Sequence, residues 1–137
     1  MSEEEKLIEL ISDARFVFIC GNGGSASTAE HFSSDLLFKK IPAICLNSNV
    51  SAITMIANDY GYDKIFSIQL SRYATEDDLL ITISCSGTSA NIVEAQEYAE
   101  MLGMTVYKFE TFKKGEPNYE ELEDKHLQLI HRIRKLL

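Results

Sequence analysis

The sequence predicts an α/β fold: a three-layer αβα sandwich of the flavodoxin-like type, with a parallel sheet of about four to five strands. Short apolar runs alternate with helix-competent stretches along the chain, as right-handed βαβ units require. The run DLLITIS at 78–84 is apolar on both faces, which is typical of a central parallel strand. With 137 residues, of which 45% are hydrophobic, the chain is expected to form a single domain over residues 1–137.

The elements follow from local patterns taken in order. Each expected strand is a short apolar or β-branched run, and these runs lie at 15–20, 42–47, 78–84 and 105–109. Helices are expected around and between them at 3–13, 25–39, 50–58, 63–73, 89–102 and 118–136. Pro42 can open a strand without losing a needed donor, and Gly103 ends a helix as glycine commonly does.

Composition excludes several classes of partner. The net charge is −8 and Lys and Arg form no cluster, which argues against nucleic acid or an anionic membrane as the main partner. No apolar run approaches the roughly 20 residues that cross a bilayer. The N-terminal MSEEEKLIEL has no features of a secretory or transit signal, so a cytoplasmic protein is expected. The spacings of Cys20, Cys45 and Cys85 fit neither zinc nor a disulfide framework, which favours buried thiols.

A glycine-rich loop, Gly21-Asn22-Gly23-Gly24-Ser25, joins the first strand to a helix. Its glycines allow close approach of the backbone, and the helix N-terminus favours an anion; a plain turn capped by serine is the alternative. The segment also satisfies a loose G-x-G-x-x-A dinucleotide pattern, but the acidic residue that should hold a ribose is missing, because the next strand ends in Asn47-Ser48-Asn49. No Gly-Lys-Ser/Thr follows, so neither nucleotide class is favoured.

A second loop, Ser84-Cys85-Ser86-Gly87-Thr88-Ser89, also joins a strand to a helix. Four hydroxyls in six residues form a compact donor set for one phosphate, although a serine-rich helix cap would have the same appearance. Both loops follow strands at the carboxyl edge of the sheet, where ligands bind in such folds. Together they indicate a phosphate ligand more specifically than either loop alone.

The segments GNGGSASTAEHFSSDL, IANDYGYDKIF and ISCSGTSANIVEA resemble the sugar isomerase (SIS) domain, and in particular the phosphoheptose isomerase family. The resemblance runs from about residue 15 to 109, and HLQLIH in the last helix also fits. It implies isomerisation of sedoheptulose 7-phosphate to a heptose 7-phosphate through an enediol, in lipopolysaccharide heptose biosynthesis. It also implies a homo-oligomer, dimer or tetramer, with sites at subunit interfaces. The substrate-binding residues that it implies are Asn22, Gly23, Gly24, Ser25, Asp59, Ser84, Ser86, Ser89 and Glu123.

The same resemblance implies catalysis by Asp35 as the base that moves the carbon proton and His131 as its acid–base partner. Some relatives hold zinc between these helices, and the corresponding ligands are His31, Asp35, Glu123 and His131; a metal-free site remains the alternative. His31 and Asp35 share a helix face that is expected to lie away from the apolar face of Ala26, Ala29, Phe32, Leu36 and Leu37.

The last helix carries an apolar stripe of Leu122, His126, Leu129, Ile130 and Ile133. His131 lies roughly 140° round from His126, so packing of the stripe on the sheet would point His131 outward, toward a neighbouring subunit.

The chain departs from the family pattern in ways that keep a second function open. Asp35 replaces the usual glutamate and Glu123 the usual glutamine, and the family's last strand is expected to be absent. A non-catalytic phosphosugar-binding module, acting as a sensor or an adaptor for a protein partner, is therefore the alternative. An adaptor in DNA replication would need a protein partner because the surface is acidic. A dinucleotide-dependent oxidoreductase fits least.

Overall fold

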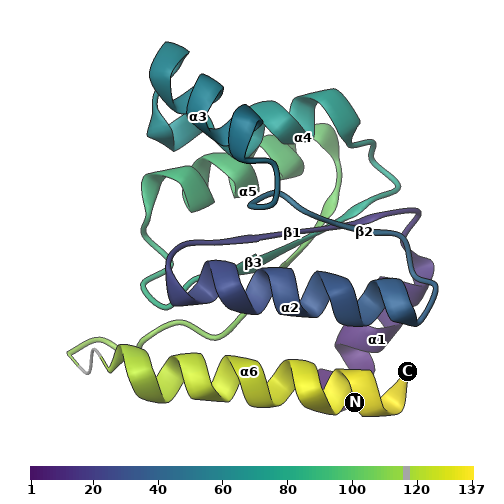
Figure 1. Ribbon diagram of the computed structural model, residues 1–137. Coiled ribbons are helices and arrows are strands. Elements are labelled where there is room, and N and C mark those ends of the chain that lie inside the picture. Colours follow the sequence, from purple (N-terminus) through teal and green to yellow (C-terminus); the bar gives the residue numbers. More distant parts are fainter. Residues whose placement is uncertain (116–117) are drawn as a thin grey trace.

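The computed structural model describes residues 1–115 and 118–137, which form a parallel sheet between two helical layers (Figure 1). The sheet has four strands in the order β2-β1-β3-β4. Their bounds are β1 Val17–Gly21, β2 Ala43–Cys45, β3 Leu79–Ile83 and β4 Thr105–Lys108. Every neighbouring pair is parallel, so the predicted fold class is confirmed at the lower end of the expected strand number.

Six helices cover the sheet, three on each face (Figure 1). One face carries α1 Glu3–Asp13, α2 Gly24–Phe38 and α6 Tyr119–Leu136, and the other carries α3 Val50–Asp59, α4 Ser67–Tyr73 and α5 Ala90–Leu102. Side chains cap the first turns of α1 and α3: Ser2 accepts a hydrogen bond from Glu5 N and Asn49 accepts one from Ala52 N. Such caps satisfy amide groups that the first helical turn leaves without partners.

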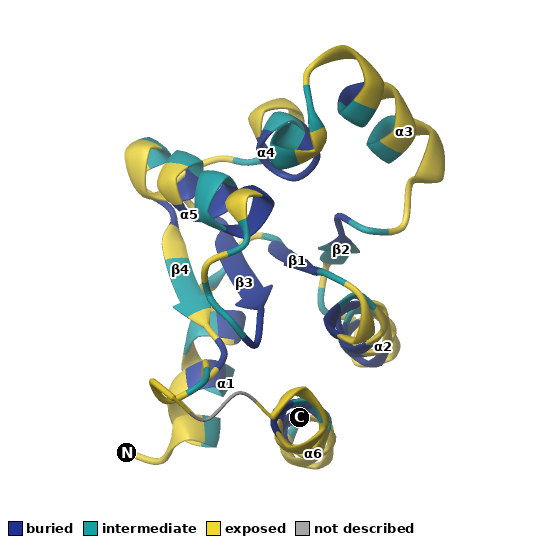
Figure 2. Ribbon diagram, turned by 90° about the vertical axis from the view of Figure 1, so that its left-hand side faces the viewer, coloured by how far each residue is buried: buried dark blue, intermediate teal, exposed yellow. Residues whose placement is uncertain are grey.

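The strands separate two hydrophobic cores, because successive side chains point to opposite faces. In β1, Val17 and Ile19 join the core under α1, α2 and α6, while Phe18 and Cys20 join the core under the other three helices. Both β1 and β3 are buried along their whole length, as Figure 2 shows. The expectation of central, doubly covered strands is thereby met.

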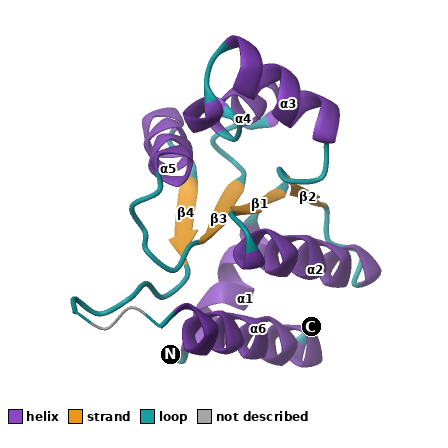
Figure 3. Cartoon of the chain, turned by 60° about the vertical axis from the view of Figure 1, so that its left-hand side comes forward, coloured by secondary structure: helices purple, strands orange, loops and turns teal. Residues whose placement is uncertain are grey.

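The strand order creates a switch point between β1 and β3. The chain leaves β1 through α2 toward β2, and it leaves β3 through α5 toward β4 on the opposite side of the sheet. The loops after these two adjacent strands therefore diverge at the carboxyl edge, where open sheets of this kind bind ligands. Figure 3 shows β1 and β3 as neighbours within the sheet. The glycine-rich loop follows β1 and the serine-rich loop follows β3.

Several expected boundaries shift by one or two residues. The helix after the first loop begins at Gly24, with Gly23 as its N-cap at φ 59°, because glycine tolerates this left-handed conformation. The single helix expected at 63–73 is wrong: a 3₁₀ turn, Tyr62–Lys64, precedes a separate α4. The expected loss of the last family strand is matched, since the described residues after β4 lead to α6 without another strand.

Helix α6 packs along α2 as well as against the sheet. Glu123 meets Gly24, His131 meets His31 and Arg134 approaches Asp35, so the two helices run parallel, as Figure 1 shows. The stripe expected on α6 is confirmed, because its five residues are the buried ones of that helix.

The expected orientation of α2 is partly wrong. Asp35 is only 8% exposed, whereas Leu37 is 66% exposed, because α6 covers the Asp35 side of the helix. His131 is exposed, as expected, and its ring lies edge-on to the ring of His31.

Within the part of the chain that the structure describes, no helix combines the length and apolarity needed to span a bilayer.

Candidate functional site

The two loops predicted to bind phosphate enclose one cavity of about 290 Å³ at the switch point. Its lining contains eight of the nine substrate-binding residues expected from the sequence: Asn22, Gly23, Gly24, Ser25, Ser84, Ser86, Ser89 and Glu123. Cys85 and Tyr119 complete the lining. The first loop, the second loop and the start of α6 therefore meet around a single space, although their residues lie about 100 positions apart in the sequence.

The glycine-rich loop is braced from the neighbouring strand β2. Asn47 accepts a hydrogen bond from Gly21 N (3.1 Å) and donates one to Gly21 O (2.7 Å). A Cβ on Gly21 would lie 2.7 Å from the carbonyl oxygens of both Ile83 and Ser25, so only glycine fits between β3 and α2. Asn47 stands near the position where a dinucleotide-binding protein would carry its ribose acid, and here its amide supports the loop instead.

A pair of amides joins the two loops directly. Asn22 Nδ2 donates to Asn91 Oδ1 (2.8 Å), and Asn91 Nδ2 donates to Asn22 Oδ1 (2.9 Å). Asn91, at the start of α5, is 3% exposed, and Tyr62 Oη lies 3.4 Å from the same Asn22 oxygen. The local sequence pattern did not predict a role in the site for Asn91, Tyr62 or Asn47. Only their positions after strands or at a helix start could have indicated them.

The serine-rich loop holds its hydroxyls ready to donate. Ser84 Oγ accepts from Gly87 N (3.0 Å) and Ser86 Oγ accepts from Thr88 N (3.2 Å), which leaves each O–H free to donate into the cavity. Ser89 is the N-cap of α5, but its side chain makes no capping hydrogen bond. The alternative of a simple serine cap is therefore wrong, and the three serines line the cavity beside the N-terminus of α5.

Charge is sparse around this cavity. None of its lining residues is Lys, Arg or His, and Glu123 is the one acidic residue among them. An anion bound here depends on amide and hydroxyl donors and on the ends of α2 and α5 rather than on a cationic side chain. Burial raises the pKa of the Cys85 thiol, and this thiol therefore adds no charge to the lining of the cavity. Burial likewise raises the pKa values of Cys20 and Cys45, and all three cysteines are free and buried, as expected.

Asp59 lies apart from the cavity. It is the last residue of α3, is exposed, and accepts a hydrogen bond from the adjacent Asn58 side chain (3.0 Å). From the same segment, Tyr62 is the residue that reaches the first loop. In this structure Asp59 therefore does not join the other expected binding residues.

Asp35, His31 and His131 form a second cluster farther along α2. His31 Nε2 is 3.6 Å from Asp35 Oδ2, and Arg134 Nε is 3.9 Å from Asp35 Oδ1. The rings of His31 and His131 are 5.3 Å apart. Asp35 Oδ2 is buried without a hydrogen-bond partner among the described residues. Asp35 follows Gly24 by eleven residues, or about 16 Å of helix, so within one chain this cluster is separate from the cavity at the switch point.

The four expected zinc ligands are not gathered. Glu123 lies against Gly24, whereas His131 is two turns farther along α6. Among the described residues no group of three or more His, Cys, Asp or Glu side chains is arranged to hold a metal ion. The residues of one chain thus do not fit a zinc site as they stand, and the zinc site stays a prediction.

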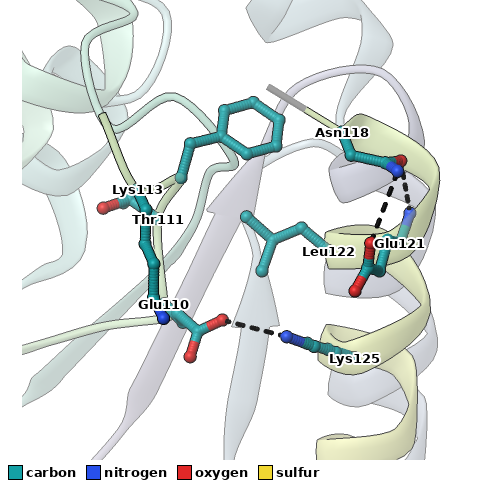
Figure 4. A pocket seen from close by; sticks show the side chains of 8 residues that line it. Glu110, Thr111, Lys113, Asn118, Glu121, Leu122 and Lys125 are labelled. Carbon is teal, nitrogen blue, oxygen red and sulfur yellow. Dashed lines mark hydrogen bonds and ion pairs between the residues drawn. The ribbon is translucent and has the colours of Figure 1, made fainter. Parts of the chain in front are cut away.

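A larger cavity of about 510 Å³ lies between the segment after β4 and the first turns of α6 (Figure 4). Glu110 and Lys125 face each other across it at 3.9 Å, and Asn118 caps α6 by accepting from Glu121 N (3.1 Å). None of the expected binding or catalytic residues lines it. The Asn118 cap beside this cavity holds the first turn of α6, and Glu123 follows that turn.

Comparisons with known proteins agree with this arrangement. The SIS domain model matches residues 4–109. The phosphoheptose isomerase of Helicobacter pylori strain P12 is 45% identical over 104 residues, which cover 72% of this chain and 54% of that protein. That of Shewanella denitrificans is 43% identical over 108 residues, covering 74% and 55%. The chain thus spans about half the length of the curated relatives that it matches.

Two solved structures extend the similarity to the whole described fold. The phosphoheptose isomerase of Neisseria gonorrhoeae superimposes with a TM-score of 0.88 at 31% identity, covering 97% of this chain and 81% of that one. That of Francisella tularensis gives 0.89 at 30% identity, covering 97% and 83%. The matching model, the identities and the shared fold show that this chain belongs to the SIS domain family, within its phosphoheptose isomerase branch.

Proposed function

We propose that the protein is a phosphosugar isomerase that interconverts sedoheptulose 7-phosphate and a heptose 7-phosphate, in the supply of heptose for lipopolysaccharide. The observation that carries this proposal is the single cavity at the switch point, around which the glycine-rich and serine-rich loops converge. The relatives named phosphoheptose isomerase support the same reaction class. A cytoplasmic location stays part of the proposal.

The phosphate group binds between the two loops. The amides at the start of α2 and the hydroxyls of Ser84, Ser86 and Ser89 surround it with donors. The amide pair of Asn22 and Asn91 holds the loops at a fixed separation, so little ordering is needed when the ligand enters. The sugar chain then extends from the cavity toward the acid–base groups.

Catalysis requires proton transfer at two carbons and two oxygens. Asp35 takes a proton from C1 of the ketose, which forms an enediol, and returns it to C2 to form the aldose. His131 takes the proton from the C1 hydroxyl and supplies one to the oxygen on C2. The buried Asp35 oxygen without a partner is consistent with a base held ready for a substrate.

The distance between the cavity and Asp35 favours an oligomer. The separation of about 16 Å along α2 is large for one ligand to bridge inside one chain. We therefore place each active site at a subunit interface of a dimer or tetramer, where the cavity of one chain faces Asp35 and His131 of another. Sedimentation equilibrium of the purified protein tests this: a monomer at assay concentration, together with full activity, contradicts it.

The decisive experiment follows aldose–ketose exchange by proton NMR with a panel of sugar phosphates that includes sedoheptulose 7-phosphate. We expect an aldose anomeric signal to appear with that substrate. Asp35→Asn and His131→Ala should each abolish turnover while sugar phosphate binding, measured by calorimetry, survives. The matched controls are Asp124→Asn and Gln128→Ala, both exposed on α6, and both should retain activity.

A non-catalytic phosphosugar-binding module is the second candidate, and the separation between the cavity and Asp35 is the observation that favours it. Binding of sugar phosphates without exchange in any of them, by a protein with unperturbed folding, would support this module and refute the isomerase. Unchanged rates in both Asp35→Asn and His131→Ala would instead remove these residues from the mechanism. Metal analysis of protein purified without added zinc tests separately the zinc site that the family resemblance implies.

A further inference from the structure

Glu123 lies inside the cavity that the proposed function assigns to phosphate. A Cβ built on Gly24 would overlap the Glu123 carboxylate, with Glu123 Cδ only 2.8 Å away. The carboxylate therefore rests directly on the first residue of α2, where the helix N-terminus and the glycine-rich loop attract an anion.

The surroundings leave Glu123 without any neutralising partner. The other side chains that line the cavity are uncharged, and the ion pairs found in residues 1–115 and 118–137 do not include Glu123. The carboxylate is held there by its helix. Asn118 caps the first turn of α6, and Leu122 and His126 on either side of Glu123 are buried.

We propose that Glu123 competes with phosphate for the position beside Gly24 and that it selects sugar phosphates over inorganic phosphate. This inference rests on the proposed function and adds the specificity-determining residue of the same site. Like charges cannot share the position at close range, so a phosphate group must displace the carboxylate from Gly24.

The two kinds of ligand are affected differently. When inorganic phosphate binds, the favourable contact between Glu123 and the N-terminus of α2 is lost, and only the hydrogen bonds from the two loops are gained. A sugar phosphate also brings hydroxyl groups, and these can donate hydrogen bonds to the displaced carboxylate. The Glu123 carboxylate therefore weakens the binding of small anions, and it weakens the binding of a sugar phosphate less because the sugar hydroxyls bond to it.

The test is isothermal titration calorimetry of the full chain with inorganic phosphate and with sedoheptulose 7-phosphate. Glu123→Gln should tighten the binding of inorganic phosphate at least fivefold, and it should tighten the binding of the sugar phosphate by a smaller factor, because the sugar hydroxyls only partly compensate the carboxylate. An equal factor for the two ligands refutes the selection. Asp124→Asn is the matched control, because it removes the same charge one residue along α6 at an exposed position. It should change both affinities less than twofold.

The outcomes separate this inference from the proposed function. If the unmodified protein binds sedoheptulose 7-phosphate but Glu123→Gln leaves phosphate binding unchanged or weaker, only the role of Glu123 is refuted. The same holds if Asp124→Asn gives an equal gain. If neither ligand binds to any variant, both proposals fail. In the unmodified protein, the carbon-13 shift of the Glu123 carboxyl should change as phosphate saturates the site, and an unchanged shift refutes the displacement.

Discussion

Replacement of Asn91 by alanine tests whether the amide pair holds the two loops together. The substitution removes two partly buried hydrogen bonds, of 2.8 and 2.9 Å, between the loop that follows β1 and the first turn of α5. A net contribution of about 1 kcal/mol for each bond predicts a loss of about 2 kcal/mol in the free energy of unfolding. With an unfolding entropy of roughly 2.1 cal/mol/K per residue for 137 residues, the Tm should fall by about 7 °C.

The functional consequence should exceed the loss of stability. Asn22 lines the cavity, so without Asn91 the glycine-rich loop is no longer held at a fixed distance from the serine-rich loop. The affinity for sugar phosphate, measured by calorimetry below the Tm, should therefore fall at least tenfold. Asn58→Ala is the matched control, because Asn58 bonds only to its exposed neighbour Asp59, and its Tm should change by less than about 2 °C. A variant of Asn91 with unaltered Tm and unaltered affinity refutes the role of the pair.

Three further predictions concern packing and ionisation. Gly21→Ala should lower the free energy of unfolding by about 2 kcal/mol or more, because the new Cβ meets backbone oxygens. In Gly24→Ala the new Cβ meets the movable end of the Glu123 side chain, so the loss should be smaller, and urea unfolding of both variants compares them. Phe32→Ala should cost about 3–5 kcal/mol in the same assay, and Phe38→Ala, at 88% exposure, less than about 0.5 kcal/mol; equal effects would contradict the packing. Burial lowers the pKa of His126, so at low pH the unfolded chain binds more protons than the folded one. The free energy of unfolding should therefore fall as the pH drops below about 6.5, and it should fall less steeply in His126→Gln. Identical pH profiles of stability in the two proteins would exclude this histidine as the cause.

The positions of the glycine-rich and serine-rich loops could be predicted from the sequence because their signals are local. Glycines between a strand and a helix, and hydroxyls in the same position after another strand, each indicate a loop at the carboxyl edge of a parallel sheet. The structure places eight of the nine expected binding residues around one cavity. The apolar stripe of α6 was predictable for a similar reason, since helical periodicity sets which residues are buried.

Other features could not be predicted, because they depend on contacts between distant segments. The exposure of Asp59 depends on where α3 ends relative to the first loop. The burial of Asp35 follows from the packing of α6 on α2, and residues about 100 positions apart produce it. Nothing in the local pattern around Asn91 indicates that its amide pairs with Asn22, 69 residues earlier.

The sequence by itself determined the order of strands and helices along the chain and the positions of the two loops, and it predicted the kind of ligand that they suit. These properties depend on backbone freedom, hydrophobic periodicity and donor chemistry, which act over a few residues. The tertiary structure alone decided that Glu123 rests on Gly24 and that Asp35 and His131 cluster away from the cavity. The physical reason is that the parallel packing of α2 and α6 sets which side chains meet along both helices, and this packing depends on the fit of two surfaces that no local pattern encodes.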